Sequence, residues 1–150
     1  MSKVTVVTGP PGAGKTTFVN EHRQPGDLIV DVDTLFHSLS GLPLYEKPVQ
    51  LLPYVLAARD GALNELERRP SVNAWMISMS PKSGERDDLR TRFGADVIVM
   101  ETPTIECLTR LSRDDARKGQ LTELMPVVLG WWREYEPDAR DTIIGMDVHV

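Results

Sequence analysis

Short apolar runs, rich in β-branched residues, alternate along the chain with longer segments whose apolar positions recur at helical spacing. The runs predict strands and the spaced segments predict helices. We expect strands at 4–7, 28–32, 72–78, 95–100 and 143–148, and helices at 15–22, 49–69, 84–93, 104–117 and 121–135. Strands that alternate with helices are typical of a parallel sheet with helices on both faces. The pattern therefore predicts a doubly wound α/β fold.

A glycine-rich segment separates the first expected strand from the first expected helix, and it fits the pattern G-x-x-x-x-G-K-[ST] at every position. Such a loop turns successive backbone N–H groups toward one anion at a helix N-terminus. We expect it to bind the phosphates of ATP or another nucleoside triphosphate, with Lys15 on the β- and γ-phosphates and Thr16 on Mg²⁺. The expected nucleotide-binding residues are Gly9, Pro10, Pro11, Gly12, Ala13, Gly14, Lys15, Thr16 and Thr17.

Two carboxylates, Asp31 and Asp33, come at the carboxyl end of the second expected strand. Ligands bind beyond this end of the strands in open α/β sheets, and alternation along a strand would put both carboxylates on one face. We expect Asp33 to bind the substrate and accept a proton from its hydroxyl, and Asp31 to hold a Mg²⁺-bound water. The alternative is that one or both aspartates cap the next helix, because Asp is a favoured N-cap.

The end of the third expected strand, residues 74–80, carries no carboxylate that could ligate a metal or polarise a water. Its absence argues against a hydrolytic motor and favours transfer to a bound acceptor. Arg86, near the start of the next helix, is expected to contact that acceptor.

An arginine-rich segment follows the fourth expected strand. Arg113 and Arg117 are four residues apart, so a continuous helix would place them on one face. We expect them to belong to a lid over about 112–122 and to stabilise the negative charge on a transferring phosphoryl group. The alternative is a solvated face paired with neighbouring carboxylates, and this is what we expect for Arg110.

Length and composition limit the alternatives further. A chain of 150 residues indicates one domain, and a net charge of −5 argues against a wide basic surface for long duplex nucleic acid. No apolar run is long enough to span a membrane. A single cysteine, Cys107, expected to be buried, and a first strand close to Met1 that leaves no room for a signal peptide lead us to expect a cytoplasmic protein. Of the adjacent Trp131 and Trp132, one is expected to point away from the core, for example toward a second copy in a homo-oligomer.

Taken together, these residues resemble the 5′-hydroxyl polynucleotide kinase branch of the P-loop phosphotransferases, in a compact form like those encoded by phages. The resemblance covers most of residues 3–136. It implies ATP and Mg²⁺ on Lys15 and Thr16, Asp33 as general base, and Arg113 and Arg117 as the lid pair. The acceptor that it implies is the 5′-OH end of a nucleic acid.

This sequence departs from the family pattern at two places. Met79 stands where the family often has a carboxylate, and Phe36 and His37 occupy the stretch where an arginine often follows the base. Other functions therefore stay open. A small-metabolite kinase of the shikimate type also has an Asp-x-Asp after strand two, although 79–82 lacks the glycine-rich motif of those enzymes. A nucleoside kinase and a regulatory module that hydrolyses ATP slowly are the remaining alternatives.

Overall fold

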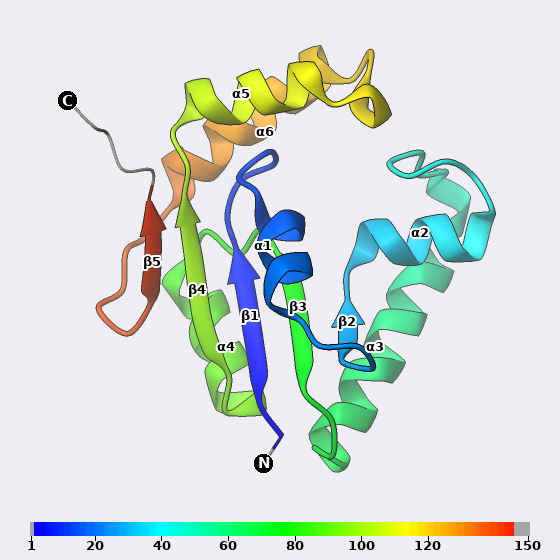
Figure 1. The fold of residues 1–150 in the computed structure, drawn as a ribbon, viewed down its shortest axis with the longest axis vertical. Helices are drawn as coiled ribbons and strands as arrows, with labels where there is room; N and C mark the ends of the chain where they lie inside the picture. Colours follow the sequence, from blue (N-terminus) through cyan, green and yellow to red (C-terminus); the bar gives the residue numbers. More distant parts are fainter. Residues whose placement is uncertain (1, 146–150) are drawn as a thin grey trace.

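A computed structural model describes residues 2–145, in which a five-stranded parallel sheet with the order β2-β3-β1-β4-β5 is covered by helices on both faces (Figure 1). The strands are β1 Val4–Thr8, β2 Leu28–Val30, β3 Ala74–Ser78, β4 Asp96–Glu101 and β5 Thr142–Gly145. The helices are α1 Lys15–His22, α2 Val32–Ser40, α3 Leu52–Arg68, α4 Ser83–Phe93, α5 Thr104–Arg113 and α6 Leu121–Glu134, with 3-10 turns η1 Val49–Leu51 and η2 Asp115–Arg117. The doubly wound α/β prediction is confirmed.

The central strand β1 is apolar on both sides because it is covered on both sides. All five of its residues are buried, and it pairs in register with β3 and β4, so that Val7 lies opposite Ile77 and Ile98. One core cluster joins the sheet to α3 and α4, the other joins it to α1 and α5, and α6 contributes residues to both. Continuous apolar runs of this kind are typical of buried parallel strands. The glycine-rich loop follows β1 directly, at the carboxyl edge of the sheet.

The second strand is shorter than expected. It ends at Val30, and α2 begins at Val32, so the expectation of a strand through Val32 is wrong. Asp31 is the N-cap of α2: its backbone is extended, and its carboxylate accepts a hydrogen bond from the backbone N–H of Asp33 (3.4 Å). Asp33 therefore lies in the first turn of a helix rather than beside Asp31 on a strand face. Of the two aspartates, Asp31 is the one that caps.

The helix expected over 104–117 is also shorter. α5 ends at Arg113, and the chain turns at Asp114, whose carboxylate accepts from the backbone N–H of Ala116 (3.0 Å) and starts η2. This local hydrogen bond offers the backbone an alternative to continued helix. Arg113 and Arg117 consequently do not share a helical face, and that expectation is wrong.

Both tryptophans of α6 point inward, so the expectation that one faces away from the core is wrong. The Trp131 indole N–H donates to the Met79 carbonyl (2.6 Å), and that of Trp132 donates to the Thr102 carbonyl (3.2 Å). Their rings meet edge to face (5.1 Å between centroids). The two indoles thus fix the backbone just beyond the carboxyl ends of β3 and β4.

The final strand, expected at 143–148, is present as β5 and pairs in parallel with β4; residues 146–148 lie outside the described part of the chain. Cys107 is buried as expected, and burial raises the pKa of its thiol to about 11. Across residues 2–145, none of the helices combines the length and apolarity that crossing a membrane requires.

Candidate functional site

The phosphate loop joins β1 to α1 and depends on glycine for its shape. Gly12 has a φ of +77°, and a Cβ there would lie 2.7 Å from the Cys107 carbonyl oxygen and 2.8 Å from Leu111 Cγ. Gly14 is the N-cap of α1 with a φ of +97° and has no side chain to occupy the helix N-terminus. Residues 14–17 line a cavity, and the first backbone N–H groups of a helix have no intrahelical partner, as an anion site requires.

Lys15 is half-buried, and its ammonium donates to the Gly9 carbonyl (2.6 Å). Burial lowers the pKa of Lys15 to about 8, while the negative charges of Asp33 and Asp31 act in the opposite direction. The side chain thus folds back over the loop and lies near both carboxylates. A phosphate that replaced the Gly9 carbonyl as its partner would favour the charged ammonium.

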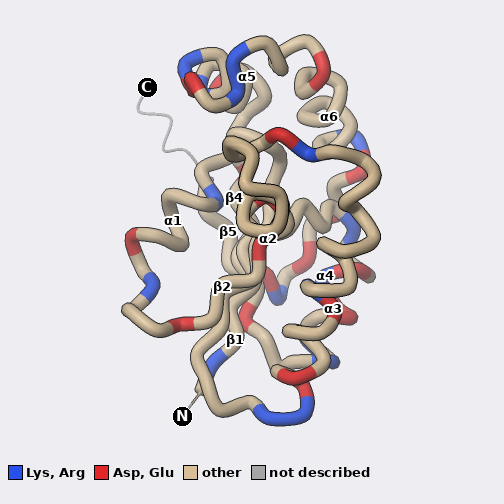
Figure 2. Tube along the Cα trace, turned by 90° about the vertical axis from the view of Figure 1, so that its right-hand side faces the viewer, with Lys and Arg blue, Asp and Glu red and all other residues tan. Residues whose placement is uncertain are grey.

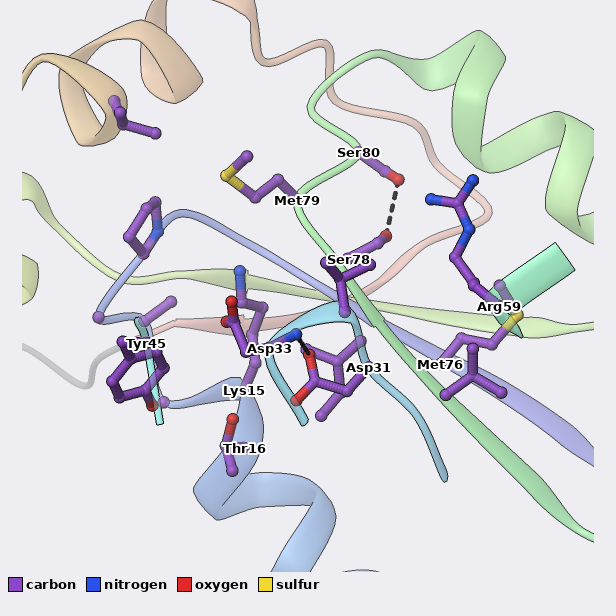
Figure 3. A pocket seen from close by; sticks show the side chains of 18 of the residues that line it. Lys15, Thr16, Asp31, Asp33, Tyr45, Arg59, Met76, Ser78, Met79 and Ser80 are labelled. Atoms are coloured by element: carbon purple, nitrogen blue, oxygen red, sulfur yellow. Dashed lines mark hydrogen bonds between the residues drawn. The ribbon is translucent and has the colours of Figure 1, made fainter. Parts of the chain in front are cut away.

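A cavity of about 960 Å³ opens at the carboxyl edge of the sheet, in front of the phosphate loop. Most of the residues expected to form the site line this cavity: Pro11, Gly12, Ala13, Gly14, Lys15, Thr16, Thr17, Asp31, Asp33 and Arg117. Figure 3 shows Lys15 and Thr16 on one side, Asp31 and Asp33 beside them, and the end of β3 with Met79 on the opposite wall. The volume is at the upper end for a ligand pocket, so it has room for a nucleotide and a second ligand.

The two aspartates play different parts in this cavity. Asp31 is buried, and besides capping α2 it accepts from the Thr34 hydroxyl (2.7 Å). Asp33 is more open, with 27% of its side chain exposed, and it forms an ion pair with Lys47 (3.1 Å). The carboxylate of Asp33 is therefore the one that an acceptor can approach.

Arg117 reaches into the cavity from η2. Its guanidinium carbon lies 3.6 Å from the centroid of the Tyr45 ring, and its Nη2 lies 3.9 Å from Asp33 Oδ2. Only 13% of the Arg117 side chain is exposed, although η2 lies at the surface. Arg117 thus lines the cavity near Asp33, and its expected role as a lid cation over a transferred phosphoryl group stays a prediction.

The sequence led us to expect Arg113 at the site and Arg110 on the solvated face of the helix, and the structure shows the reverse. Arg113 is exposed and does not line the cavity. Arg110 does line it: Nε pairs with Glu106 as expected (3.0 Å), while Nη1 donates to the Ala13 carbonyl in the phosphate loop (2.9 Å). The arginines beside the loop are thus Arg110 and Arg117.

Arg86 is buried in a structural network and does not face the cavity, contrary to expectation. None of its side chain is exposed, and it forms an ion pair with Asp141 (2.9 Å). It also donates to the Ser80 (3.0 Å), Pro81 (2.9 Å) and Glu136 carbonyls. With its donors used in this way, Arg86 holds α4 to the segment before β5 and has no free donor for an acceptor.

The far half of the cavity lies between β3, α3 and α4. Ser78 and Ser80 share a hydrogen bond there (2.7 Å), and Met76 and Leu63 contribute apolar surface (Figure 3). Charged side chains of both signs form the rim of this half. They are Lys47, Arg59, Asp60, Glu85, Asp88 and Arg92. This half has the mixed apolar and polar lining of a small-molecule or nucleotide site.

Three residues near the site were missed from the sequence: Tyr45, Lys47 and Arg110. The helical positions of Cys107 and Leu111 could have identified Arg110. At about 100° per residue, Arg110 lies about 60° around the helix from Cys107 and about 100° from Leu111, whereas Arg113 lies about 120° from Cys107 and about 160° from Leu111. No comparable signal marks Tyr45 and Lys47, because the irregular loop between α2 and η1 has no period.

The chemistry of the donors fits Mg²⁺, which keeps several waters and is bound through one or two protein groups plus substrate phosphates. The Thr16 hydroxyl at the start of α1 and the buried Asp31 carboxylate both face the cavity. Such a site needs no cluster of three side-chain ligands, and none is found among residues 2–145. The assignment of Thr16 and Asp31 to Mg²⁺ stays a prediction.

No family model and no curated protein matches the chain, but solved structures do. A sugar kinase from Janibacter sp. HTCC2649 matches with a TM-score of 0.58 and 18% identity over 97% of this chain and 85% of its own. A shikimate kinase from Bacteroides thetaiotaomicron matches at 0.57 and 16%, over 88% and 78%. The Pnkp1/Rnl/Hen1 RNA repair complex matches at 0.60 and 15%; 90% of this chain is covered, but only 46% of that one.

The sequence identities are too low to assign the activity of any of these proteins to this chain. The matches cover nearly the whole chain, however, and share the parallel sheet and its helices. The protein has the fold of the P-loop kinases.

Proposed function

We propose that this protein is an ATP-dependent phosphotransferase that moves the γ-phosphate to a hydroxyl group. The observation that carries the proposal is the position of Asp33. Its partly exposed carboxylate lies in the same cavity as Lys15 and the phosphate loop. A carboxylate so placed can act as general base toward an acceptor hydroxyl.

In the proposed reaction, the acceptor oxygen attacks the γ-phosphorus, its proton passes to Asp33, and ADP leaves with the electron pair of the broken P–O bond. Lys15 and Arg117 supply positive charge on either side of the transferred group. Lys47 forms an ion pair with Asp33 (3.1 Å) and orients its carboxylate in the cavity. Mg²⁺, held by Thr16 and by water on Asp31, would neutralise phosphate charge.

As acceptor we propose the 5′-OH end of a nucleic acid. The resemblance to 5′-hydroxyl polynucleotide kinases supports it, as does the structural likeness to an RNA repair complex. The cations Lys47, Arg59 and Arg92 on the rim could contact the first phosphates of a strand leading away from the cavity. Along the Cα trace of the described residues, Lys and Arg are interspersed with Asp and Glu (Figure 2), and the chain has a net charge of −5. Recognition would therefore be confined to the strand end.

A small hydroxylated metabolite is the second candidate, because Asp60, Glu85 and Asp88 offset the rim cations. A neutral acceptor would suit this balance, and the structural neighbours include a sugar kinase. Salt dependence separates the two candidates. With about 0.7 released counterions per single-strand phosphate, contacts at three rim cations predict a slope of about −2 in log affinity against log salt. A neutral metabolite predicts a slope near zero.

The test is transfer of labelled γ-phosphate from ATP·Mg²⁺ to 5′-OH DNA, 5′-OH RNA, nucleosides, shikimate and simple sugars, with Lys15→Ala as the inactive control. Strong labelling of a 5′-OH oligonucleotide supports the first candidate. Labelling of a small molecule alone supports the second. ATP hydrolysis that no acceptor stimulates would contradict the proposal of a phosphotransferase.

A further inference from the structure

The loop of residues 41–48, between α2 and η1, contains one residue, Tyr45, in an unfavourable backbone conformation. Tyr45 has a φ of +74°, in the left-handed region that aromatic residues rarely adopt. Such a conformation costs free energy and persists only where surrounding contacts compensate for it. The contacts of Tyr45 with neighbouring segments must therefore offset this cost.

Two of these contacts join the loop to the lid. The guanidinium of Arg117 lies over the Tyr45 ring, with its central carbon 3.6 Å from the ring centroid. The Gln120 side-chain amide donates to the Tyr45 carbonyl (3.2 Å). Burial raises the pKa of the Tyr45 phenol, so the ring beside Arg117 stays neutral at physiological pH.

The same loop also contacts the candidate base, because Lys47 pairs with Asp33 (3.1 Å). One short segment thus touches the two charged groups that flank the proposed reaction centre. Neither residue belongs to the phosphate loop, to the aspartates or to the lid arginines. The ion pair between Arg117 and Asp33 is long (3.9 Å), so the stack on Tyr45 is the closer contact of the Arg117 guanidinium.

We propose that Tyr45 is a positioning residue that holds Arg117, and with it the lid, over the junction between phosphate loop and acceptor. The stack with the ring and the bond from Gln120 form a clasp, defined here as Tyr45, Arg117 and Gln120. Lys47 of the same loop pairs with Asp33. The loop therefore positions the proposed base, Asp33, and the lid cation, Arg117, relative to each other. The catalytic part of this inference rests on the proposed phosphotransferase function.

The kinetic test compares Tyr45→Leu with Tyr45→Phe, which keeps an aromatic face. Tyr54→Leu is the matched control, because Tyr54 is 68% exposed on α3 and does not line the cavity. A cation–π contact of this kind predicts a loss of about 2- to 30-fold in kcat for Tyr45→Leu, with KM for ATP nearly unchanged. Tyr45→Phe should retain most of the activity, and Tyr54→Leu should match the wild type.

A double-mutant cycle then shows whether Tyr45 acts through Arg117. In an Arg117→Ala background, Tyr45→Leu should cause no further loss of kcat, because the interaction is already gone. Independent, multiplying losses would overturn the proposal. So would a Tyr45→Phe variant as impaired as Tyr45→Leu.

A second measurement does not depend on activity. Trypsin should cleave after the exposed Lys118 faster in Tyr45→Leu and in Gln120→Ala than in wild type or in Tyr54→Leu. If opening of the clasp limits cleavage, the expected increase in rate is again about 2- to 30-fold. Both clasp variants are checked for native thermal melting, and Gln120→Ala decides if Tyr45→Leu does not fold. Equal cleavage rates would overturn the clasp. Faster cleavage together with no transfer to any acceptor would instead overturn the proposed function and leave the clasp standing.

Discussion

Replacing Arg110 should weaken ATP binding much more than replacing Arg113. The two arginines stand three residues apart on α5, and both are exposed enough to tolerate alanine. Only Arg110 contacts the phosphate loop, through its bond to the Ala13 carbonyl, and its Nη1 lies 2.9 Å from where a Cβ on Gly14 would be. Arg113→Ala is therefore a matched control for charge and helix position.

The magnitude follows from Coulomb's law for a charge near a bound phosphate. A unit charge about 6 Å from a phosphate contributes about 3 kcal/mol at an effective dielectric constant near 20. The Arg110 side chain is 42% exposed, so solvent screening reduces this to about 1–2 kcal/mol, or about 5- to 30-fold in affinity. The fold should lose little, because the Ala13 carbonyl also accepts from the Thr102 hydroxyl (2.9 Å).

Titration calorimetry with ATP·Mg²⁺ on both variants measures this difference directly, and urea unfolding checks that their stabilities are similar. We expect a 5- to 30-fold rise in Kd for Arg110→Ala and less than a twofold change for Arg113→Ala. Equal weakening in the two variants would show that the contact of Arg110 with the phosphate loop gives it no special role and that the placement of Arg113 outside the cavity is wrong.

Three further predictions concern the phosphate loop and the core. Burial lowers the pKa of Lys15 to about 8, so its side chain is mostly charged below pH 8 and mostly neutral above it. Calorimetry should therefore show ATP affinity falling between about pH 7.5 and 9.5. The Lys15→Met variant should not show this pH dependence. Asp141→Asn should lower the free energy of unfolding by about 3–5 kcal/mol in urea titrations, whereas Asp96→Asn, at a 63% exposed ion pair, should change it by less than about 1 kcal/mol; equal effects would contradict the buried network. Gly12→Ala should destabilise the protein by about 1–3 kcal/mol and abolish nucleotide binding, because its methyl group would meet the Cys107 carbonyl; a stable variant that binds ATP would refute this loop geometry.

The sequence predicted the sheet and the phosphate loop well because both depend on strong local signals. Apolar β-branched runs define buried strands, and the glycine pattern permits one loop shape. The same signals failed at the element ends. At Asp31 and Asp114, a side chain that bonds the backbone two residues ahead decided the boundary, and apolar spacing does not report this.

The candidate site was predicted in part for the same reason. Lys15 and Asp33 follow directly from motif and strand order. Arg86 was misplaced, because its position near the cavity gave no sign of the buried Asp141, which follows it by 55 residues. Tyr45 and Lys47 reach the site from an irregular loop, whose path depends on tertiary contacts with Arg117 and Asp33.

The account depends most directly on Asp33 as the base in a phosphoryl transfer. The measurement is single-turnover transfer of labelled γ-phosphate to the best acceptor from the panel, by wild type and by Asp33→Asn, with ATP affinity measured on the same samples. General-base catalysis predicts a loss of about 10²- to 10⁴-fold in the transfer rate, with ATP binding retained. Transfer at the wild-type rate in a folded Asp33→Asn variant would contradict the central claim.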